Sequence, residues 1–381
     1  MAIEHQLRET LGKRASKGNL RSLTTTDSLV DFFSNDYLGL ARSQELWHLI
    51  RQNYDRLAPR SNGATGSRLL SGNSAYYEQL ESYLASLFKA EATLVFNAGY
   101  SANLAVLSSI AQKNDTIIYD DTIHACIKEG ARLSLARYYS FKHNDIDDLT
   151  RKIALAEGNI FVAVESIYSM DGDRGKLIEI LEVCKKHGAQ LIVDEAHSTG
   201  ILGENGNGLV CQLGIEKEVF LRVYTFGKAM GVHGACVAGS QVVKDYLINF
   251  ARAFIYTTAL PQHSLVSIRS AFEYLEKNAG LQQKLQKVIN HFNTKVKTYH
   301  HADDKVHFLR NQSAIQVVIV PGNDRAKKMA LALQAKGFDV RPILSPTVRE
   351  GSERIRICLH VFNTEEEING LVAAIFEMTH E

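Results

Sequence analysis

The segment Val223-Tyr-Thr-Phe-Gly-Lys-Ala-Met-Gly231 carries Lys228 at the end of an apolar, strand-like run that breaks at Gly227. Upstream, a second apolar run, Gln190-Leu-Ile-Val-Asp194, ends in Asp194 and continues as Glu-Ala-His-Ser-Thr-Gly. In open α/β sheets, residues that follow buried strands meet in loops at one edge of the sheet. We therefore expect Lys228 and Asp194 to lie close to each other in an α/β protein.

A lysine and an aspartate in this arrangement suit pyridoxal 5'-phosphate. The lysine amine forms a Schiff base with the cofactor aldehyde, and the carboxylate keeps the pyridine nitrogen protonated, so that the ring accepts electrons. Each residue alone has an ordinary interpretation. A lysine after a strand is usually a solvated surface amine, and an aspartate there often forms a turn or caps a helix. The hypothesis therefore depends on finding other parts of the same site in order.

The scaffold around these two residues follows from the hydrophobic pattern. Between about residues 90 and 240, short apolar runs alternate with amphipathic stretches, which is typical of a mostly parallel sheet covered by helices on both faces. The pattern predicts a central sheet of seven strands, at 93–96, 116–119, 137–141, 160–164, 190–193, 222–225 and 235–238.

Three regions are expected along the chain. Residues 1–45 form an N-terminal helix and arm, residues 46–280 form the large domain, and residues 281–381 form a smaller C-terminal α+β domain. The N-terminal helix is predicted from the helical spacing of its apolar residues. Strands of the small domain are expected at 314–320, 339–343 and 354–358, and helices at 324–336 and 364–379.

The bulk composition narrows the classes of function. The chain has 381 residues, of which 45% are hydrophobic and 22% charged, with a net charge of +1. Such a charge gives no electrostatic reason to expect nucleic acid or a membrane as partner. The polar N-terminus resembles no targeting peptide, and five scattered cysteines indicate reduced thiols in a cytoplasmic protein. No metal site is expected, because the histidines lack a recognisable ligand spacing.

Further candidate site residues follow other strands. Gly99 opens a strand-to-helix turn where amide groups suit a phosphate, and Thr225 could add a hydroxyl to that phosphate. His124 could stack on a flat ring, His197 could donate a hydrogen bond to a phenolic oxygen, and Ser169 occupies a similar strand-end position. Singly, these residues are also consistent with an ordinary turn, a structural histidine or a helix cap. Dinucleotide-binding and P-loop glycine motifs are absent from the sequence, which argues against a nicotinamide enzyme or an ATPase.

Longer segments carry a resemblance that runs through nearly the whole chain. The chain resembles the α-oxoamine synthase family of fold-type I pyridoxal phosphate-dependent transferases. The matching segments are Ser34-Asn-Asp-Tyr-Leu-Gly-Leu40, Gly63-Ala-Thr-Gly-Ser-Arg-Leu-Leu-Ser-Gly72, Met170-Asp-Gly-Asp173, Asp194-Glu-Ala-His-Ser-Thr-Gly200 and Thr225-Phe-Gly-Lys228. Two more segments, Phe250–Thr258 and Val340–Val348, resemble the branch that forms 8-amino-7-oxononanoate. One segment departs from that branch, Cys358-Leu-His-Val-Phe-Asn363, where a threonine and small residues are usual.

The resemblance implies a role for each site residue. Lys228 is the Schiff-base lysine, Asp194 pairs with the pyridine nitrogen, His124 stacks on the ring, and Ser169 and His197 meet the phenolic oxygen. The resemblance also implies which residues contact the phosphate: Gly99, Tyr100, Thr225 and, from a partner subunit, Thr257 or Thr258. Arg356 and Asn35 are implied to bind the carboxylate of the amino acid, and Arg21 the distal carboxylate of the acyl chain.

The implied activity is a decarboxylative condensation of L-alanine with pimeloyl thioester, carried by coenzyme A or acyl carrier protein. It yields 8-amino-7-oxononanoate, CO2 and free thiol in biotin biosynthesis, by a homodimer with shared active sites. Alternatives are a 2-amino-3-ketobutyrate ligase, a serine palmitoyltransferase or a non-catalytic partner subunit. An aminotransferase would share the fold and cofactor but should lack the oxoamine-type segments.

Overall fold

The computed structural model describes residues 2–380 except for 24, 26–27, 300–306 and 310. Contacts within this part of the chain divide it into two compact units. The large unit comprises Asp36–Ser169 and Asp173–Lys284, and the small unit comprises Met1–Asn35, Met170–Gly172 and Leu285–Glu381. The three domains expected from the sequence, with boundaries at 45/46 and 280/281, stay a prediction about folding units.

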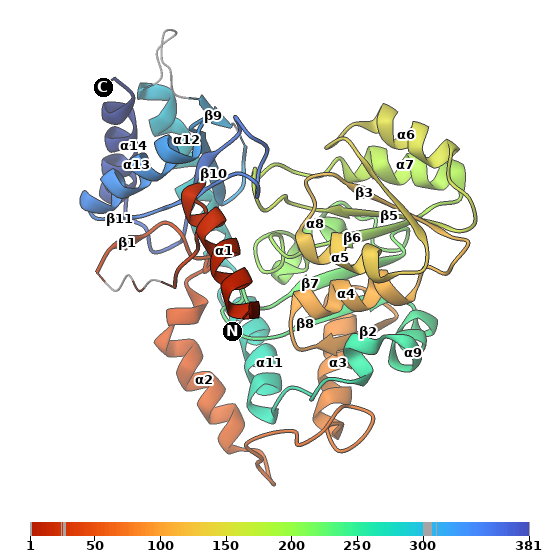
Figure 1. Ribbon diagram of the computed structural model, residues 1–381. Helices are drawn as coiled ribbons and strands as arrows, with labels where there is room; N and C mark the ends of the chain where they lie inside the picture. Colours follow the sequence, from red (N-terminus) through yellow and green to blue (C-terminus); the bar gives the residue numbers. More distant parts are fainter. Residues whose placement is uncertain (1, 24, 26–27, 300–306, 310, 381) are drawn as a thin grey trace. The chain divides into compact units, whose positions relative to one another are not determined.

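A seven-stranded sheet forms the centre of the large unit (Figure 1). β8 runs antiparallel to both β2 and β7, and the other neighbouring pairs are parallel. The predicted α/β architecture with a mostly parallel seven-stranded sheet is therefore confirmed. In spatial order the strands are β2 (Ala92–Phe96), β8 (Ala235–Gly239), β7 (Leu221–Thr225), β6 (Gln190–Asp194), β5 (Ile160–Glu165), β3 (Thr116–Asp120) and β4 (Arg137–Phe141).

Helices cover both faces of this sheet because successive strand residues point to opposite sides. In β5, Phe161 and Ala163 join one apolar cluster, whereas Val162 and Val164 join another. The first cluster includes α4 (Gly99–Ser109), α5 (Ala125–Leu133), α9 (Gln241–Phe250) and α10 (Arg252–Ile255). The second includes α6 (Ile146–Ala154), α7 (Leu177–His187) and α8 (Gly208–Gln212). The other helical elements of this unit are η1 (Leu40–Arg42), α2 (Gln44–Asp55), α3 (Ala75–Leu87), η2 (Glu204–Gly206) and α11 (Gln262–Lys277).

Local sequence signals fix where several of these helices begin and end. Ser43, Ser74, Asp145 and Ser240 cap α2, α3, α6 and α9, each accepting a hydrogen bond from a backbone amide in the first turn. Gly188 ends α7 in the left-handed region, at φ 68°, which glycine adopts without a steric penalty. These signals hold the loops at the strand ends to short, defined paths.

The small unit is built on an antiparallel sheet in the order β12 (Arg341–Ile343), β13 (Arg354–Cys358), β10 (Ile315–Ile319) and β9 (His307–Leu309). A parallel pair, β1 (Val30–Asp31) and β11 (Phe338–Asp339), joins the N-terminal arm to this unit. Its helices are α1 (Ala2–Ser16), α12 (Gly280–Tyr299), which enters the unit at Leu285, α13 (Asn323–Ala335) and α14 (Glu365–His380).

The strand expected at 339–343 is split into β11 and β12 in the structure. Between them Val340 is fully buried, and Pro342 lies in the edge strand β12, where the missing proline amide breaks no ladder. Among the described residues, no helix combines the length and apolar character that a membrane span needs.

Candidate active site

Four strands of the large unit end in polar residues at one edge of the sheet. The parallel strands β3, β5, β6 and β7 end at Asp120, Glu165, Asp194 and Thr225. Glu165 lies directly opposite Asp194 in the β5–β6 pairing. The carboxyl ends of parallel strands are where α/β folds bind ligands. The tertiary structure thus gathers these side chains where the sequence predicts a site.

Lys228 lies three residues beyond β7 and contacts a histidine that follows β6. Its Nζ is 2.8 Å from Nε2 of His197, and Nδ1 of His197 is 2.8 Å from the hydroxyl of Tyr37. The direction of both hydrogen bonds depends on the tautomer of His197. The two contacts hold the buried His197 ring between Tyr37 and Lys228.

Asp194 is buried, and both of its carboxylate oxygens are bound by neighbours. Oδ2 accepts a hydrogen bond from Nδ2 of Asn103 at 2.7 Å, and Oδ1 accepts one from the amide of Ala196 at 2.8 Å. Asn103 is itself buried on α4, among alanine and valine side chains. A buried carboxylate fixed in this way suits a positively charged partner such as a protonated ring nitrogen.

The start of α4 has the shape of a phosphate cradle. A Cβ atom on Gly99 would come within 3.2 Å of the Thr225 side chain, so a larger residue would press against Thr225 in this space. Ala98, at the N-cap of α4, has no side-chain oxygen to bind the first amide groups of the helix. Tyr100 is 46% exposed beside them. An anion at a helix N-terminus is favoured by free amide donors and by the helix dipole. These residues fit the phosphate of pyridoxal 5'-phosphate.

Thr257 and Thr258 contact Asn97, the residue that follows β2. Nδ2 of Asn97 is 3.3 Å from Oγ1 of Thr257 and 2.8 Å from the carbonyl oxygen of Thr258. The next residue, Ala259, donates its amide hydrogen to the carbonyl oxygen of Gly66 at 2.9 Å. The segment Gly63–Gly72 and the threonine pair are therefore packed against each other.

Glu165 links two more candidate residues through their backbone. Its carboxylate accepts hydrogen bonds from the amides of His124, at 2.6 Å, and Ser169, at 3.2 Å. Burial, and then the charge of Asp194, raise the pKa of Glu165. Desolvation and the positive charge of Lys228 lower the pKa of His124, although its ring remains partly open to solvent. A neutral, partly exposed imidazole suits stacking on a flat ring.

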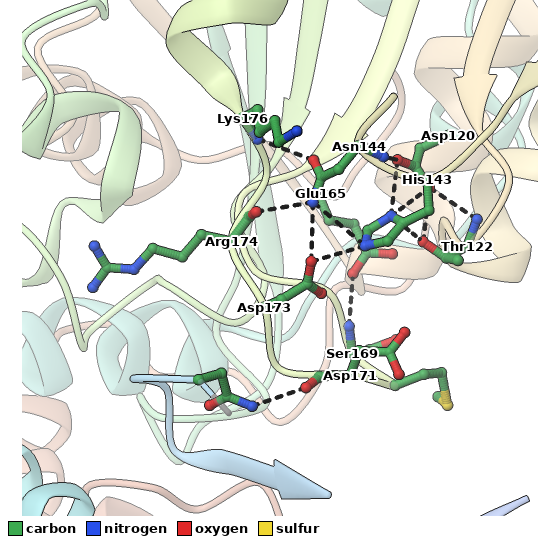
Figure 2. A network of polar contacts seen from close by, with 12 residues as sticks. Asp120, Thr122, His143, Asn144, Glu165, Ser169, Asp171, Asp173, Arg174 and Lys176 are labelled. Atoms are coloured by element: carbon green, nitrogen blue, oxygen red, sulfur yellow. Dashed lines mark hydrogen bonds and ion pairs between the residues drawn. The ribbon is translucent and has the colours of Figure 1, made fainter. Parts of the chain in front are cut away.

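A second polar network holds the loop that carries Ser169 (Figure 2). Nδ1 of His143 is 3.0 Å from both carboxylate oxygens of the fully buried Asp120, and Nε2 is 2.8 Å from Oδ2 of Asp173. Burial alone would lower the pKa of His143, but the hydrogen bonds and charges of Asp120 and Asp173 outweigh it and raise the pKa to about 10. His143 is therefore a cation at neutral pH.

Asp173 belongs to a short hairpin that begins after β5. The amide of Tyr168 donates to the carbonyl oxygen of Asp173 at 2.9 Å, and Ile167 pairs with Arg174. Asn144 adds hydrogen bonds from Nδ2 to Asp173, at 2.9 Å, and to the Arg174 carbonyl oxygen, at 3.1 Å (Figure 2). The His143 cation thus fixes the base of the hairpin that presents Ser169.

The substrate-binding candidates lie in the small unit. Nη2 of Arg356, on β13, donates to Oδ1 of Asn35 at 2.9 Å, and the arginine side chain is buried. Arg21 is exposed, in a segment without regular secondary structure. The structure therefore brings Arg356 and Asn35 together, and the roles assigned to all these candidate residues stay predictions.

Several residues of the site were not singled out from the sequence, and their signals are of different strength. Asn103 is the polar residue among the otherwise apolar buried residues of α4, which usually marks a specific buried hydrogen bond. Tyr37 lies within a segment that carries the family resemblance, but nothing in the sequence indicates its partner. The partners of Glu165 and His143 depend entirely on the tertiary structure.

Comparison with protein families and solved structures identifies the class of protein to which this chain belongs. The model of the aminotransferase class I and II family matches residues 27–375. The fold also matches serine palmitoyltransferase from S. paucimobilis, with a TM-score of 0.87 and 24% identity over 98% of this chain and 96% of that one. The fold and the site define a fold-type I pyridoxal phosphate-dependent transferase.

Curated relatives of known name indicate the branch of the family to which this chain belongs. An 8-amino-7-oxononanoate synthase from Emericella nidulans is 42% identical, over 98% of this chain and 95% of the relative. An 8-amino-7-oxononanoate synthase from Alkalilimnicola ehrlichii is 34% identical, over 98% of this chain and 97% of the relative. The fold also matches the crystal structure of 8-amino-7-oxononanoate synthase from Francisella tularensis, with a TM-score of 0.78 and 29% sequence identity, over 93% of this chain and 99% of that one. This chain belongs to the aminotransferase class I and II family and, within it, to the α-oxoamine synthases.

Proposed function

We propose that this protein catalyses the decarboxylative condensation of L-alanine with pimeloyl thioester, giving 8-amino-7-oxononanoate, CO2 and free thiol. The observation that carries the proposal is the nearly full-length similarity to the Emericella nidulans synthase, at 42% identity. The site supports it, because Lys228, His197 and Asp194 lie at the ends of neighbouring strands. A non-catalytic subunit would need none of these three residues.

Bound pyridoxal 5'-phosphate would supply an electron sink for the bonds at the alanine Cα atom. Lys228 would hold the cofactor and then move the proton at that Cα atom. His197, whose Nδ1 contacts the hydroxyl of Tyr37, would direct Nε2 toward the reacting face. Asp194 would face the ring nitrogen, because Asn103 and the Ala196 amide fix its carboxylate in place.

The phosphate would lie at the start of α4, bound by Gly99, Tyr100 and Thr225, with Thr257 or Thr258 reaching in from a partner subunit. His124 would stack on the ring, and Ser169 would meet its phenolic oxygen. We infer a homodimer with shared active sites from the resemblance to the α-oxoamine synthases.

Arg356, with Asn35, would bind the alanine carboxylate through a bidentate pair of hydrogen bonds, which fixes the orientation of the Cα bonds. Arg21 would pair with the distal carboxylate of the pimeloyl chain. Thioesters of coenzyme A and of acyl carrier protein, compared in the assay below, distinguish the two expected acyl carriers, and cell fractionation tests the expected cytoplasmic location.

The test is release of free thiol, measured with purified enzyme across pairs of amino acid and acyl thioester, with Lys228→Ala as the negative control. We expect the highest kcat/KM for L-alanine with pimeloyl thioester. A preference for glycine with acetyl-CoA, or for serine with palmitoyl-CoA, would assign the chain to a sister enzyme of the same family. Thiol release from no pair, by protein that binds the cofactor, would favour a non-catalytic subunit.

A further inference from the structure

A buried histidine follows β13 in the segment that departs from the family pattern. His360 is 0% exposed, in Cys358-Leu-His-Val-Phe-Asn363. Its ring stacks on Phe362 with centroids 4.5 Å apart and planes 7° from parallel. Burial of a polar ring is costly unless both nitrogens have hydrogen-bond partners. The identity of those partners indicates what the histidine does.

The two ring nitrogens of His360 connect two segments that are distant in sequence. Nε2 is 2.9 Å from the carbonyl oxygen of Ser34 and 3.2 Å from its hydroxyl oxygen, and Nδ1 is 3.0 Å from Oδ1 of Asn363. A carbonyl oxygen and the amide oxygen of Asn363 can only accept, so both ring nitrogens donate, Nε2 to Ser34 and Nδ1 to Asn363. His360 therefore restrains the backbone of the N-terminal arm at Ser34.

The Asn363 side chain has a fixed orientation beside this ring. Its Oδ1 accepts the amide hydrogen of His360 at 2.9 Å, and its Nδ2 donates to the carbonyl oxygen of Asp31 at 3.1 Å. The turn after β13 thus contacts the arm at two carbonyl groups, those of Asp31 and Ser34. Both contacts are lost together if the turn moves.

Asp31 restrains the same part of the arm from the other side. Its carboxylate accepts the amides of Phe33, at 3.0 Å, and Ser34, at 2.9 Å, and the hydroxyl of Ser34 at 2.8 Å. Partial burial would raise the pKa of Asp31, but these hydrogen bonds and the charge of His360 outweigh it and lower the pKa to about 2. The backbone of Ser34 is therefore held between the Asp31 carboxylate, at its N–H group, and the His360 ring, at its carbonyl oxygen.

The residue after Ser34 is Asn35, whose Oδ1 accepts the hydrogen bond from Nη2 of Arg356. Arg356 lies on the central strand pair of the small sheet, four residues before His360 along the chain. The arrangement is a closed loop of contacts from His360 to Ser34, along the chain to Asn35, and back to Arg356. A shift at Ser34 would move the oxygen that orients the guanidinium.

We propose that His360 is a positioning residue for amino-acid recognition, which sets Asn35 and thereby the guanidinium of Arg356 through its hydrogen bond to the Ser34 carbonyl. The proposal rests on the role of Arg356 given under the proposed function. His360 itself touches no substrate. It determines how well the carboxylate of the amino acid is held, and it leaves the proton-transfer groups around Lys228 unchanged.

Two amide substitutions of His360 separate this role from a general packing role. Glutamine places its amide nitrogen near the position of Nε2 and keeps a donor for Ser34, whereas asparagine reaches only the position of Nδ1. The two variants differ by one methylene group, and both lose the ring. The alanine dissociation constant of purified holoenzyme is measured from the change in cofactor absorbance, and kcat and KM are measured in parallel.

We expect His360→Asn to weaken alanine binding by about tenfold, the effect of losing one to two net hydrogen bonds, with kcat at saturating alanine within about twofold. His360→Gln should retain alanine binding within about threefold of wild type. Equal weakening in both variants, or no weakening in His360→Asn, would overturn the proposal. Loss of kcat with unchanged alanine affinity would also overturn it.

A second variant covers the case in which His360→Asn does not fold. Asp31→Ala, at the partly buried last residue of β1, removes the acceptor of the Phe33 and Ser34 amides, so it should also weaken alanine binding several-fold. Unchanged alanine affinity in folded Asp31→Ala would contradict the positioning role. If wild type binds another amino acid instead of alanine, the proposed substrate fails, and the same variants measured with that amino acid still test His360.

Discussion

Replacement of His143 by alanine is expected to destabilise the large unit strongly. The pKa of His143 is raised from 6.5 to about 10, and at 1.36 kcal/mol per tenfold change in proton affinity this corresponds to at most about 5 kcal/mol. The side chain is 25% exposed, so solvent screening reduces that figure. Loss of the cation leaves the fully buried Asp120 uncompensated, and breaking such a pair costs about 3–5 kcal/mol. We therefore expect His143→Ala to lower the free energy of unfolding by about 3 kcal/mol.

The destabilisation should depend on pH in a defined direction. The folded-state pKa of His143 is above its unfolded value, so its stabilisation is fully present below about pH 6.5 and is lost as pH rises toward 10. The difference in unfolding free energy between wild type and His143→Ala should therefore shrink across this window, by at most about 1.4 kcal/mol per pH unit.

Urea denaturation of the holoenzyme, followed by circular dichroism at pH 6.5, 8 and 9.5, measures this difference. Arg137→Ala is the matched control, because Arg137 pairs with Glu157 at the surface, with side chains 57% and 68% exposed. Exposed pairs contribute about 0–1 kcal/mol. A His143→Ala effect as small as that of Arg137→Ala, or one that does not change between pH 6.5 and 9.5, would refute the buried-cation argument.

Four further predictions concern the proposed site. Borohydride reduction should fix the cofactor to Lys228, as peptide mapping would show, and an adduct on another lysine would contradict the assignment. Lys228→Ala should fold but lose turnover by orders of magnitude, since nucleophile and base are lost together. Asp194→Asn should still bind cofactor but turn over far more slowly, because the charge at the ring nitrogen is removed; near-wild-type kcat would mean that Asp194 serves only the fold. Mixing Lys228→Ala with a variant altered at Thr257 and Thr258 should restore some activity if sites are shared, whereas full activity of a verified monomer would exclude sharing. Arg21→Ala should lower kcat/KM for pimeloyl thioester by roughly 10- to 150-fold, which is the effect of losing a charge-assisted hydrogen bond. An equal loss of kcat/KM with a neutral acyl chain of the same length would argue against a carboxylate partner for Arg21.

Much of the fold was predictable because its signals are local. Most strands of the large sheet are apolar runs, and the helices between them carry caps and apolar faces that are readable within a few residues. The short strands β1 and β9 were not predicted, since two or three residues carry no measurable periodicity. The expected strand at 339–343 proved to be two, because Val340 turns into the core between them.

The sequence by itself indicated Lys228 and Asp194, because a reactive residue directly after an apolar strand is visible as a pattern. Only the tertiary structure decided their partners, since Asn103 lies 91 positions from Asp194 and Tyr37 lies 160 from His197. His360 is the clearest case. The sequence marked it as unusual, but its contact with Ser34 spans 326 positions. Hydrogen bonds between distant segments depend on the path of the chain in space, and no local periodicity encodes that path.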